Sequence, residues 1–130
     1  GSASGRRTHV EMITITLQHD PDGWIESFCA SGHAGYAADG PDIICAAVSV
    51  LAQTAIGSLR ELAGIDPPRQ LENGLIRFRL PQRAGLAASQ IQTATILMQS
   101  LIIGCKQIQA SYGSRYIRFR HRQDQGGPAR

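Results

Sequence analysis

The chain has 130 residues, 42% of them hydrophobic, which suits one compact domain with one core. Its formal net charge of +3 comes from its ends: the leader before Met12, with two Arg and one Glu, contributes +1, and the segment from Arg115, with five Arg and one Asp, contributes +4. The body is therefore at −2, which disfavours a domain shaped by phosphate attraction, so no direct nucleic-acid partner is expected.

The cysteine content and the apolar runs indicate the compartment. Three cysteines cannot all pair within one chain, and none lies in a C-x-x-C motif, so neither a disulfide framework nor a zinc site is expected. The longest apolar run, Ile43 to Leu51, is too short to span a membrane, and no charged-then-apolar leader is present. We therefore expect a cytoplasmic protein with no metal and no membrane contact.

The sequence divides into three parts. Residues 1–11 are interpreted as a leader added for expression, and Met12, where the pattern begins, is a candidate for the native start. Residues 12–121 are expected to form the single domain. Residues 122–130 have nothing to bury and are expected to form a disordered tail.

The first elements are predicted to be a hairpin followed by a long helix. Met12 to Leu17 alternates with period two, and the turn signal Pro21-Asp22-Gly23 separates it from a second extended run, Trp24 to Ser31. From Pro41 to Gly64 the chain is rich in Ala, Val, Ile and Leu and stops before Asp66-Pro67-Pro68, which predicts a helix of about 22 residues.

The predicted helix has two faces when its residues are projected at about 100° each. The apolar stripe consists of Ile44, Val48, Leu51, Ala55 and Leu62. The opposite side carries Asp42, Cys45, Ser49, Gln53 and Arg60.

The second half repeats this arrangement. The hairpin turn Glu72-Asn73-Gly74 is flanked by short strand runs, the second of them Leu75 to Leu80. A second helix from about Ala87 to Tyr112 precedes a last strand, Arg115 to His121. The order β-β-α-β-β-α-β predicts an α+β fold with a small sheet of about five strands and two long helices.

Arginines alternate with apolar residues in two of these strands. Arg77 and Arg79 share one side of the first, and Arg118 and Arg120 share one side of the second. The two strands could be neighbours and form a basic surface, while a solvated outer sheet face is the default interpretation.

A histidine and a cysteine lie at opposite ends of a loop of small residues, between the second strand and the first helix. Gly40 as N-cap and Pro41 at the first helical position place Cys45 close to the helix N-terminus, whose free N–H groups and dipole favour a thiolate. His33 is placed to accept the thiol proton and return it to a leaving amine. The pattern favours nucleophilic catalysis by Cys45.

The neighbouring residues allow more than one role. Asp42 either orients His33, binds a substrate N–H, or only favours the helix N-terminus by its charge. The Ser49 hydroxyl could simply bond to the helix backbone, and Gly32 could be an ordinary strand-end glycine or could offer an N–H or space beside the scissile carbonyl. Cys29 and Cys105 are interpreted as structural.

The motif as a whole resembles the ribosomal-processing cysteine protease family Prp. The family pattern is Gly-His, a short glycine-containing loop, Asp-x-x-Cys, and a helix of small residues that carries a serine. Gly32, His33, Asp42, Cys45 and Ser49 match it position by position.

The resemblance extends from about Met12 to about Arg120 and implies a bacterial cysteine endopeptidase that needs no cofactor. Its implied substrate is the short N-terminal extension of a large-subunit ribosomal protein, cut after an aromatic residue. The resemblance implies catalysis by His33 and Cys45, a substrate-contacting role for Ser49, and places for Asp42 and Gly32 in the site. Pro41, directly before Asp42, departs from the family pattern.

Two alternatives remain beside this interpretation. One is a non-enzymatic module that binds the ribosome or RNA through its arginine faces, and the other is a cysteine hydrolase of another peptide. We also expect a homodimer, because the first helix is apolar around nearly its whole circumference and the family resemblance points the same way.

Overall fold

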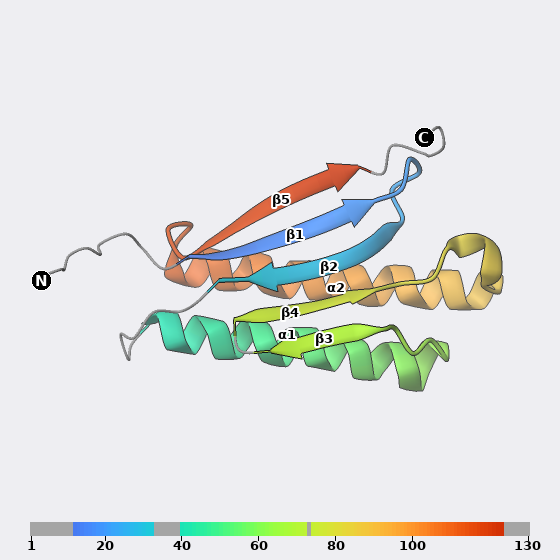
Figure 1. Cartoon of the computed structure of the whole chain (residues 1–130), viewed down its shortest axis with the longest axis horizontal. Coiled ribbons are helices and arrows are strands. Elements are labelled where there is room, and N and C mark those ends of the chain that lie inside the picture. Colours follow the sequence, from blue (N-terminus) through green and yellow to red (C-terminus); the bar gives the residue numbers. More distant parts are fainter. Residues whose placement is uncertain (1–11, 33–39, 73, 124–130) are drawn as a thin grey trace, which may run out of the picture.

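The computed structural model describes residues 12–32, 40–72 and 74–123, with the backbone alone for residues 40–42. The elements are β1 (Ile13–His19), β2 (Ile25–Ser31), α1 (Gly40–Ala63), β3 (Arg69–Glu72), β4 (Leu75–Arg79), the 3₁₀ turn η2 (Arg83–Gly85), α2 (Ala88–Tyr112) and β5 (Ile117–Gln123) (Figure 1). This order confirms the predicted α+β fold and adds η2.

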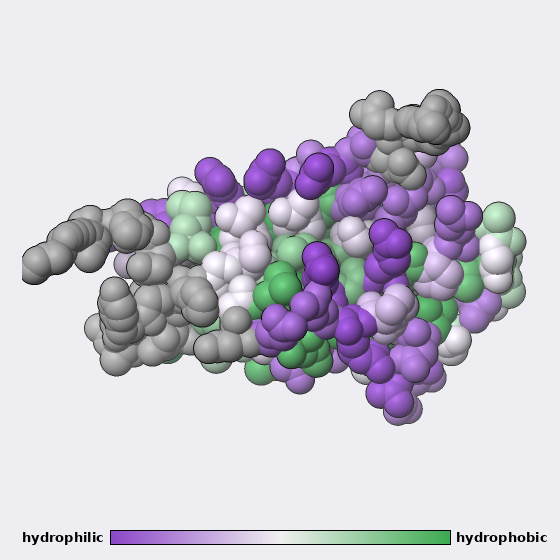
Figure 2. Space-filling model, viewed as in Figure 1, coloured by the Kyte–Doolittle hydropathy of each residue, from purple (hydrophilic) through white to green (hydrophobic). Residues whose placement is uncertain are grey.

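The five strands form one sheet in the order β3-β4-β2-β1-β5. All neighbours are antiparallel except β1 and β5, which run parallel because α2 carries the chain back across the sheet before β5 begins. Both helices cover the same face, so the fold has two layers (Figure 1). The other face is open, and Figure 2 shows hydrophilic side chains along both of its edges.

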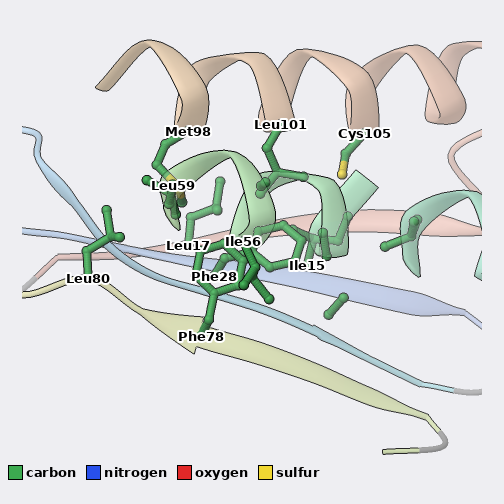
Figure 3. Close-up of a cluster of buried hydrophobic side chains, with 14 of the residues drawn as sticks. Ile15, Leu17, Phe28, Ile56, Leu59, Phe78, Leu80, Met98, Leu101 and Cys105 are labelled. Carbon is green, nitrogen blue, oxygen red and sulfur yellow. The ribbon is translucent and has the colours of Figure 1, made fainter. Parts of the chain in front are cut away.

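Alternation along the strands builds the covered face. Ile15 and Leu17 of β1 are fully buried, as are Phe28 of the neighbouring β2 and, at 2% exposure, Phe78 of β4. The rings of Phe28 and Phe78 stack with their centroids 5.6 Å apart. Helix residues such as Leu59 close this cluster from the other side (Figure 3).

The buried stripe of α1 differs from the predicted one at its C-terminal end. Ile44, Val48 and Ala55 are buried as predicted and Leu51 is half-buried, but Leu62 is 66% exposed. Leu59, fully buried, takes the place predicted for Leu62. Buried residues four apart in the sequence are displaced by about 40° around the helix axis. By the last turn the buried side of α1 has therefore moved away from the direction in which Leu62 points.

The two predicted arginine pairs share a face but do not lie on neighbouring strands. Arg77 and Arg79 belong to β4, and Arg118 and Arg120 to β5, with β2 and β1 between them. β4 and β5 have the same alternation of arginine and apolar residues in the sequence, but the crossover through α2 places them on opposite sides of the β2–β1 pair.

The ends of the elements differ slightly from those predicted. α1 already includes Gly40, which was predicted as its N-cap, and it ends at Ala63. β5 continues through Arg122 and Gln123, which pair with Gln18 and His19, so the sheet extends two residues beyond the predicted domain end. The predicted leader and the rest of the predicted tail lie outside the described residues.

Helix α1 is more apolar than the run identified from the sequence. Its segment Ile43–Ala63 is long and apolar enough to cross a membrane by length and composition, so the apolar run does not end at Leu51. The core helix of a soluble protein passes the same test. Here 33% of the segment is buried, including Ile44, Val48 and Leu59, which belong to the core that the helix shares with the sheet.

The shifted stripe gives a matched pair of variants. Leu59→Ala should lower the free energy of unfolding by about 2–5 kcal/mol, because it opens a cavity in the core. Leu62→Ala should change it by less than about 0.5 kcal/mol, because that side chain faces water. Urea unfolding of both variants is the measurement, and equal losses would contradict the observed helix rotation.

Candidate active site

Cys45 lies in the second turn of α1, close to the N-terminus of that helix. Its neighbours Ile44 and Val48 are buried, which fixes the rotation of the helix about its axis. The Cys45 side chain is half-buried, beside the buried stripe rather than within it. The thiol therefore packs against the core while part of it remains accessible.

A cavity of about 140 Å³ brings three of the predicted site residues together. Gly32 from the end of β2 and Cys45 and Ser49 from α1 all line it. The remaining lining residues are mainly apolar and come from β1, β2, α1 and the β3–β4 hairpin: Ile13, Ala30, Val48, Glu72, Gly74, Leu75 and Ile76.

Gly32 is a point of close backbone approach. Its φ of +123° is unfavourable for other residues, and a Cβ there would collide with the carbonyl oxygen of Met12. Its N–H donates to the carbonyl oxygen of Gly74 at 3.0 Å. That N–H is therefore engaged within the fold, and the position that a Cβ would take is occupied by the Met12 backbone.

The hydroxyl of Ser49 is engaged by a side chain. Gln53 Nε2 donates to Ser49 Oγ at 3.0 Å, one turn further along α1. The sequence allowed the alternative that the Ser49 hydroxyl simply bonds to the helix backbone. Within the described residues Ser49 makes no such hydrogen bond. Its own proton remains available for donation at the cavity wall.

Two predicted site residues are only partly accounted for. His33 and the loop that follows it lie outside the described residues, and so does the predicted pairing of His33 with Cys45. The backbone of Asp42 lies in the first turn of α1, and its side chain is outside the description. Gly32, the residue before His33, marks where the chain leaves β2 at the cavity wall.

The other two thiols lie elsewhere. Cys105 is fully buried in α2, and burial raises the pKa of its thiol to about 12. Cys29 lies in β2, where burial raises its thiol pKa although the nearby Arg77 opposes this effect. Both environments keep the sulfur protonated at neutral pH, as suits the structural roles predicted for them.

The sequence did not identify the β3–β4 hairpin as a wall of the site. Its turn signal was recognised, and the pairing of Glu72 with Leu75 confirms a hairpin. What places Glu72 and Gly74 beside Cys45 is the sheet order, in which β4 lies next to β2. No local pattern in the sequence carries that information.

Comparison with known proteins identifies the family. A family model described as cysteine protease Prp matches residues 12–118. The chain belongs to the Prp family. The ribosomal processing cysteine protease Prp of Bacillus subtilis (strain 168) is 30% identical to it over 103 residues, which cover 78% of this chain and 90% of that relative. The chain is thus a ribosomal processing cysteine protease, and the non-enzymatic interpretation is wrong.

Two solved structures of the essential ribosomal processing protease Prp from S. aureus share the fold. The complex with a substrate peptide superposes with a TM-score of 0.70 at 19% identity, covering 85% of this chain and 100% of that one. The complex with a covalently linked product peptide has a TM-score of 0.69 at 20% identity and the same coverage. At these identities the similarity confirms the Prp fold.

Gly32→Ala should destabilise the protein more than Gly23→Ala does. Both glycines have positive φ, but the Cβ at Gly23 has no atom within 4 Å, whereas the Cβ at Gly32 meets the Met12 backbone. Backbone strain alone costs about 1–3 kcal/mol, and the collision adds to it only at Gly32. Urea unfolding gives the free energy of unfolding of both variants. Equal destabilisation would show that the close approach of Gly32 to the Met12 backbone does not contribute to stability.

Proposed function

We propose that this protease removes the short N-terminal extension of a large-subunit ribosomal protein by cutting after an aromatic residue, with His33 and Cys45 as its catalytic dyad. The observation that carries the proposal is the position of Cys45: partly accessible, early in α1, and in the wall of a cavity shared with Gly32 and Ser49. This is the environment that a nucleophilic thiol needs.

The first half of the reaction forms a thioester. His33 takes the proton from Cys45, and the thiolate is stabilised by the N-terminal end of α1. The sulfur attacks the carbonyl carbon of the scissile peptide bond, and the C–N bond breaks as His33 returns the proton to the leaving amine. The acyl group stays on Cys45. The covalently linked product peptide in the S. aureus relative supports such an intermediate.

The second half is hydrolysis. His33 takes a proton from water, the resulting hydroxide attacks the thioester carbonyl, and the Cys45 sulfur leaves and is reprotonated. The product carries a new C-terminal carboxylate. Thiol, imidazole and water balance the chemistry, so the proposed reaction requires no metal or cofactor.

The cavity supports the preference for an aromatic residue. Ile13, Val48, Leu75 and Ile76 give it an apolar wall, which suits an aromatic side chain next to the scissile bond. Ser49 is proposed to donate its hydroxyl proton to the substrate, since it accepts from Gln53 and keeps that proton free.

Asp42 and Gly32 complete the proposed substrate-binding part of the site. Asp42 lies in the first turn of α1, three residues before Cys45, and is proposed to orient His33. Gly32 is proposed to shape the cavity wall, because the lack of a Cβ lets the Met12 backbone lie against it where the cavity meets the end of β2.

We place the reaction in the bacterial cytoplasm, where ribosomes are assembled. The relatives are from bacteria. The apolar segment of α1 has a place in the core of this fold, which supports a protein that works in water.

The active form is proposed to be a homodimer that pairs through the outer surfaces of the helices. An apolar groove of about 570 Å³ lies between α1 and α2, with Val50 and Tyr112 in its walls. Val50 is 63% exposed and Tyr112 43%, and on α2 Ile103 is 56% exposed. Apolar side chains gathered on one outer surface favour burial against a second copy.

Cys45→Ala and His33→Ala should each abolish cleavage of a peptide whose apolar run ends in Phe-Phe, with mass spectrometry as the readout. Each loss should exceed about 10³-fold, and the double variant should be no worse than either single one, because the two residues act as a unit. Cys29→Ala, which alters a thiol outside the site, is the matched control and should keep activity. A Cys45→Ala protein that still cleaves would refute the dyad, whereas cleavage at another bond would refute only the substrate assignment.

The wild-type protein should have a dimeric mass by light scattering at micromolar concentration. Val50→Glu places a charge in the groove and should shift the protein to monomer. Leu62→Glu changes an equally exposed residue of the same helix outside the groove and should leave the dimer intact. A monomeric wild type, or equal effects of the two variants, would contradict the proposed interface.

A further inference from the structure

The open face of the sheet carries exposed arginines on both of its sides. Strand register places all of them on this face, because one row reads Arg77, Cys29, Thr16 and Arg120 across β4, β2, β1 and β5. The full set is Arg77 and Arg79 of β4 and Arg118, Arg120 and Arg122 of β5, all of them exposed. Charges that are distant in the sequence therefore share one surface.

The surface between the two arginine groups is polar and uncharged. It consists of Ser27 and Cys29 of β2 and Thr14, Thr16 and Gln18 of β1. Three interstrand spacings of roughly 4.8 Å separate β4 from β5, so the groups lie about 14 Å apart. A hollow of about 570 Å³ lies between them, with Arg77, Arg79 and Arg122 among its lining residues.

The ion pairs between described residues leave the positive charge of this face in place. Among the described residues none of the five arginines forms an ion pair, whereas Arg60, Arg69 and Arg83 each pair with an aspartate. By register Glu72 also belongs to this face, at its end. The Glu72 carboxylate accepts a hydrogen bond from Gln70 at 2.7 Å.

We propose that this face binds single-stranded RNA through its sugar–phosphate backbone. The β5 arginines recur every second residue, about 6.8 Å apart, a spacing similar to that of successive phosphates in an extended strand. The arginine fork suits phosphate oxygens, and the hydroxyl and amide groups of the middle strip suit phosphate and 2′-hydroxyl groups.

The composition of the face favours RNA over an acidic protein. Protein interfaces draw their energy from a buried centre of aromatic and apolar side chains. By register Phe28, Phe78 and Phe119 belong to the helix-covered face, so the open face lacks such a centre within the described strands. The described strand residues of that face also offer no aromatic platform for bases, so binding should be independent of sequence.

This inference replaces the expectation, drawn from the net charge of the body, that no nucleic acid is bound directly. It goes beyond the processing reaction and does not depend on the dyad. Cys45 belongs to α1, on the covered side of the sheet, so the two surfaces can act at the same time. A protease that holds RNA on one face could be retained beside a substrate that is itself bound to ribosomal RNA.

The test uses fluorescence anisotropy of a labelled 20-nucleotide RNA of mixed sequence, titrated with the full-length protein over a series of salt concentrations. The double variant Arg77→Gln/Arg120→Gln should weaken binding about tenfold. It should also make the slope of log K against log salt concentration shallower by about 1.4, since each of the two lost contacts to a single-strand phosphate contributes about 0.7. Arg60→Gln/Lys106→Gln removes the same charge away from this face and should weaken binding less than twofold.

Thermal unfolding followed by circular dichroism checks that both double variants keep the fold. Equal weakening by the two variants would overturn the proposal, because it would show that binding depends only on the net charge of the protein. A glutamate-rich peptide of the same charge as the RNA should bind much more weakly. If it binds as tightly as the RNA, the surface is a site for an acidic protein and the proposal fails.

Discussion

Burial of one stripe of α1 against one face of the sheet is the constraint on which the rest of this structure depends. A helix is rigid about its axis, so burying Ile44, Val48 and Leu59 leaves it a single rotation. That rotation places Cys45 and Ser49 one turn apart at the rim of the core. The proposed nucleophile is thus positioned by apolar packing that has no chemical role of its own.

A second constraint acts at the end of β2, where three segments of backbone meet. Gly32 lies against Met12 and donates its N–H to Gly74, which ties the end of the strand to the β3–β4 hairpin. A residue with a Cβ does not fit there. The chain therefore leaves the sheet at the cavity wall, and the cavity lies where that exit meets the N-terminal part of α1.

The two faces of the sheet carry different chemistry because strand residues alternate. One face supplies the apolar layer under the helices, and the other remains in contact with water, as is common in antiparallel sheets. An exposed face is free to carry charge without any cost of burial. In this protein arginines gather on its two sides, so the binding proposed for the open face and the catalysis proposed for the covered side do not compete for residues.

Much of this protein was determined by its sequence alone. Period-two alternation identified strands, apolar spacing and terminators identified both helices, and the run from Gly32 to Ser49 identified the family, because each of these signals is local. Tertiary structure decided what depends on contacts between distant segments. In the core, Leu59 is buried where Leu62 was predicted, and the N–H of Gly32 donates to Gly74. The hairpin at Gly74 lies beside the Cys45 thiol, and two strands separate the arginines of β4 from those of β5. Strand order follows from how the crossover helix packs across the sheet, and no periodicity within one segment encodes that path.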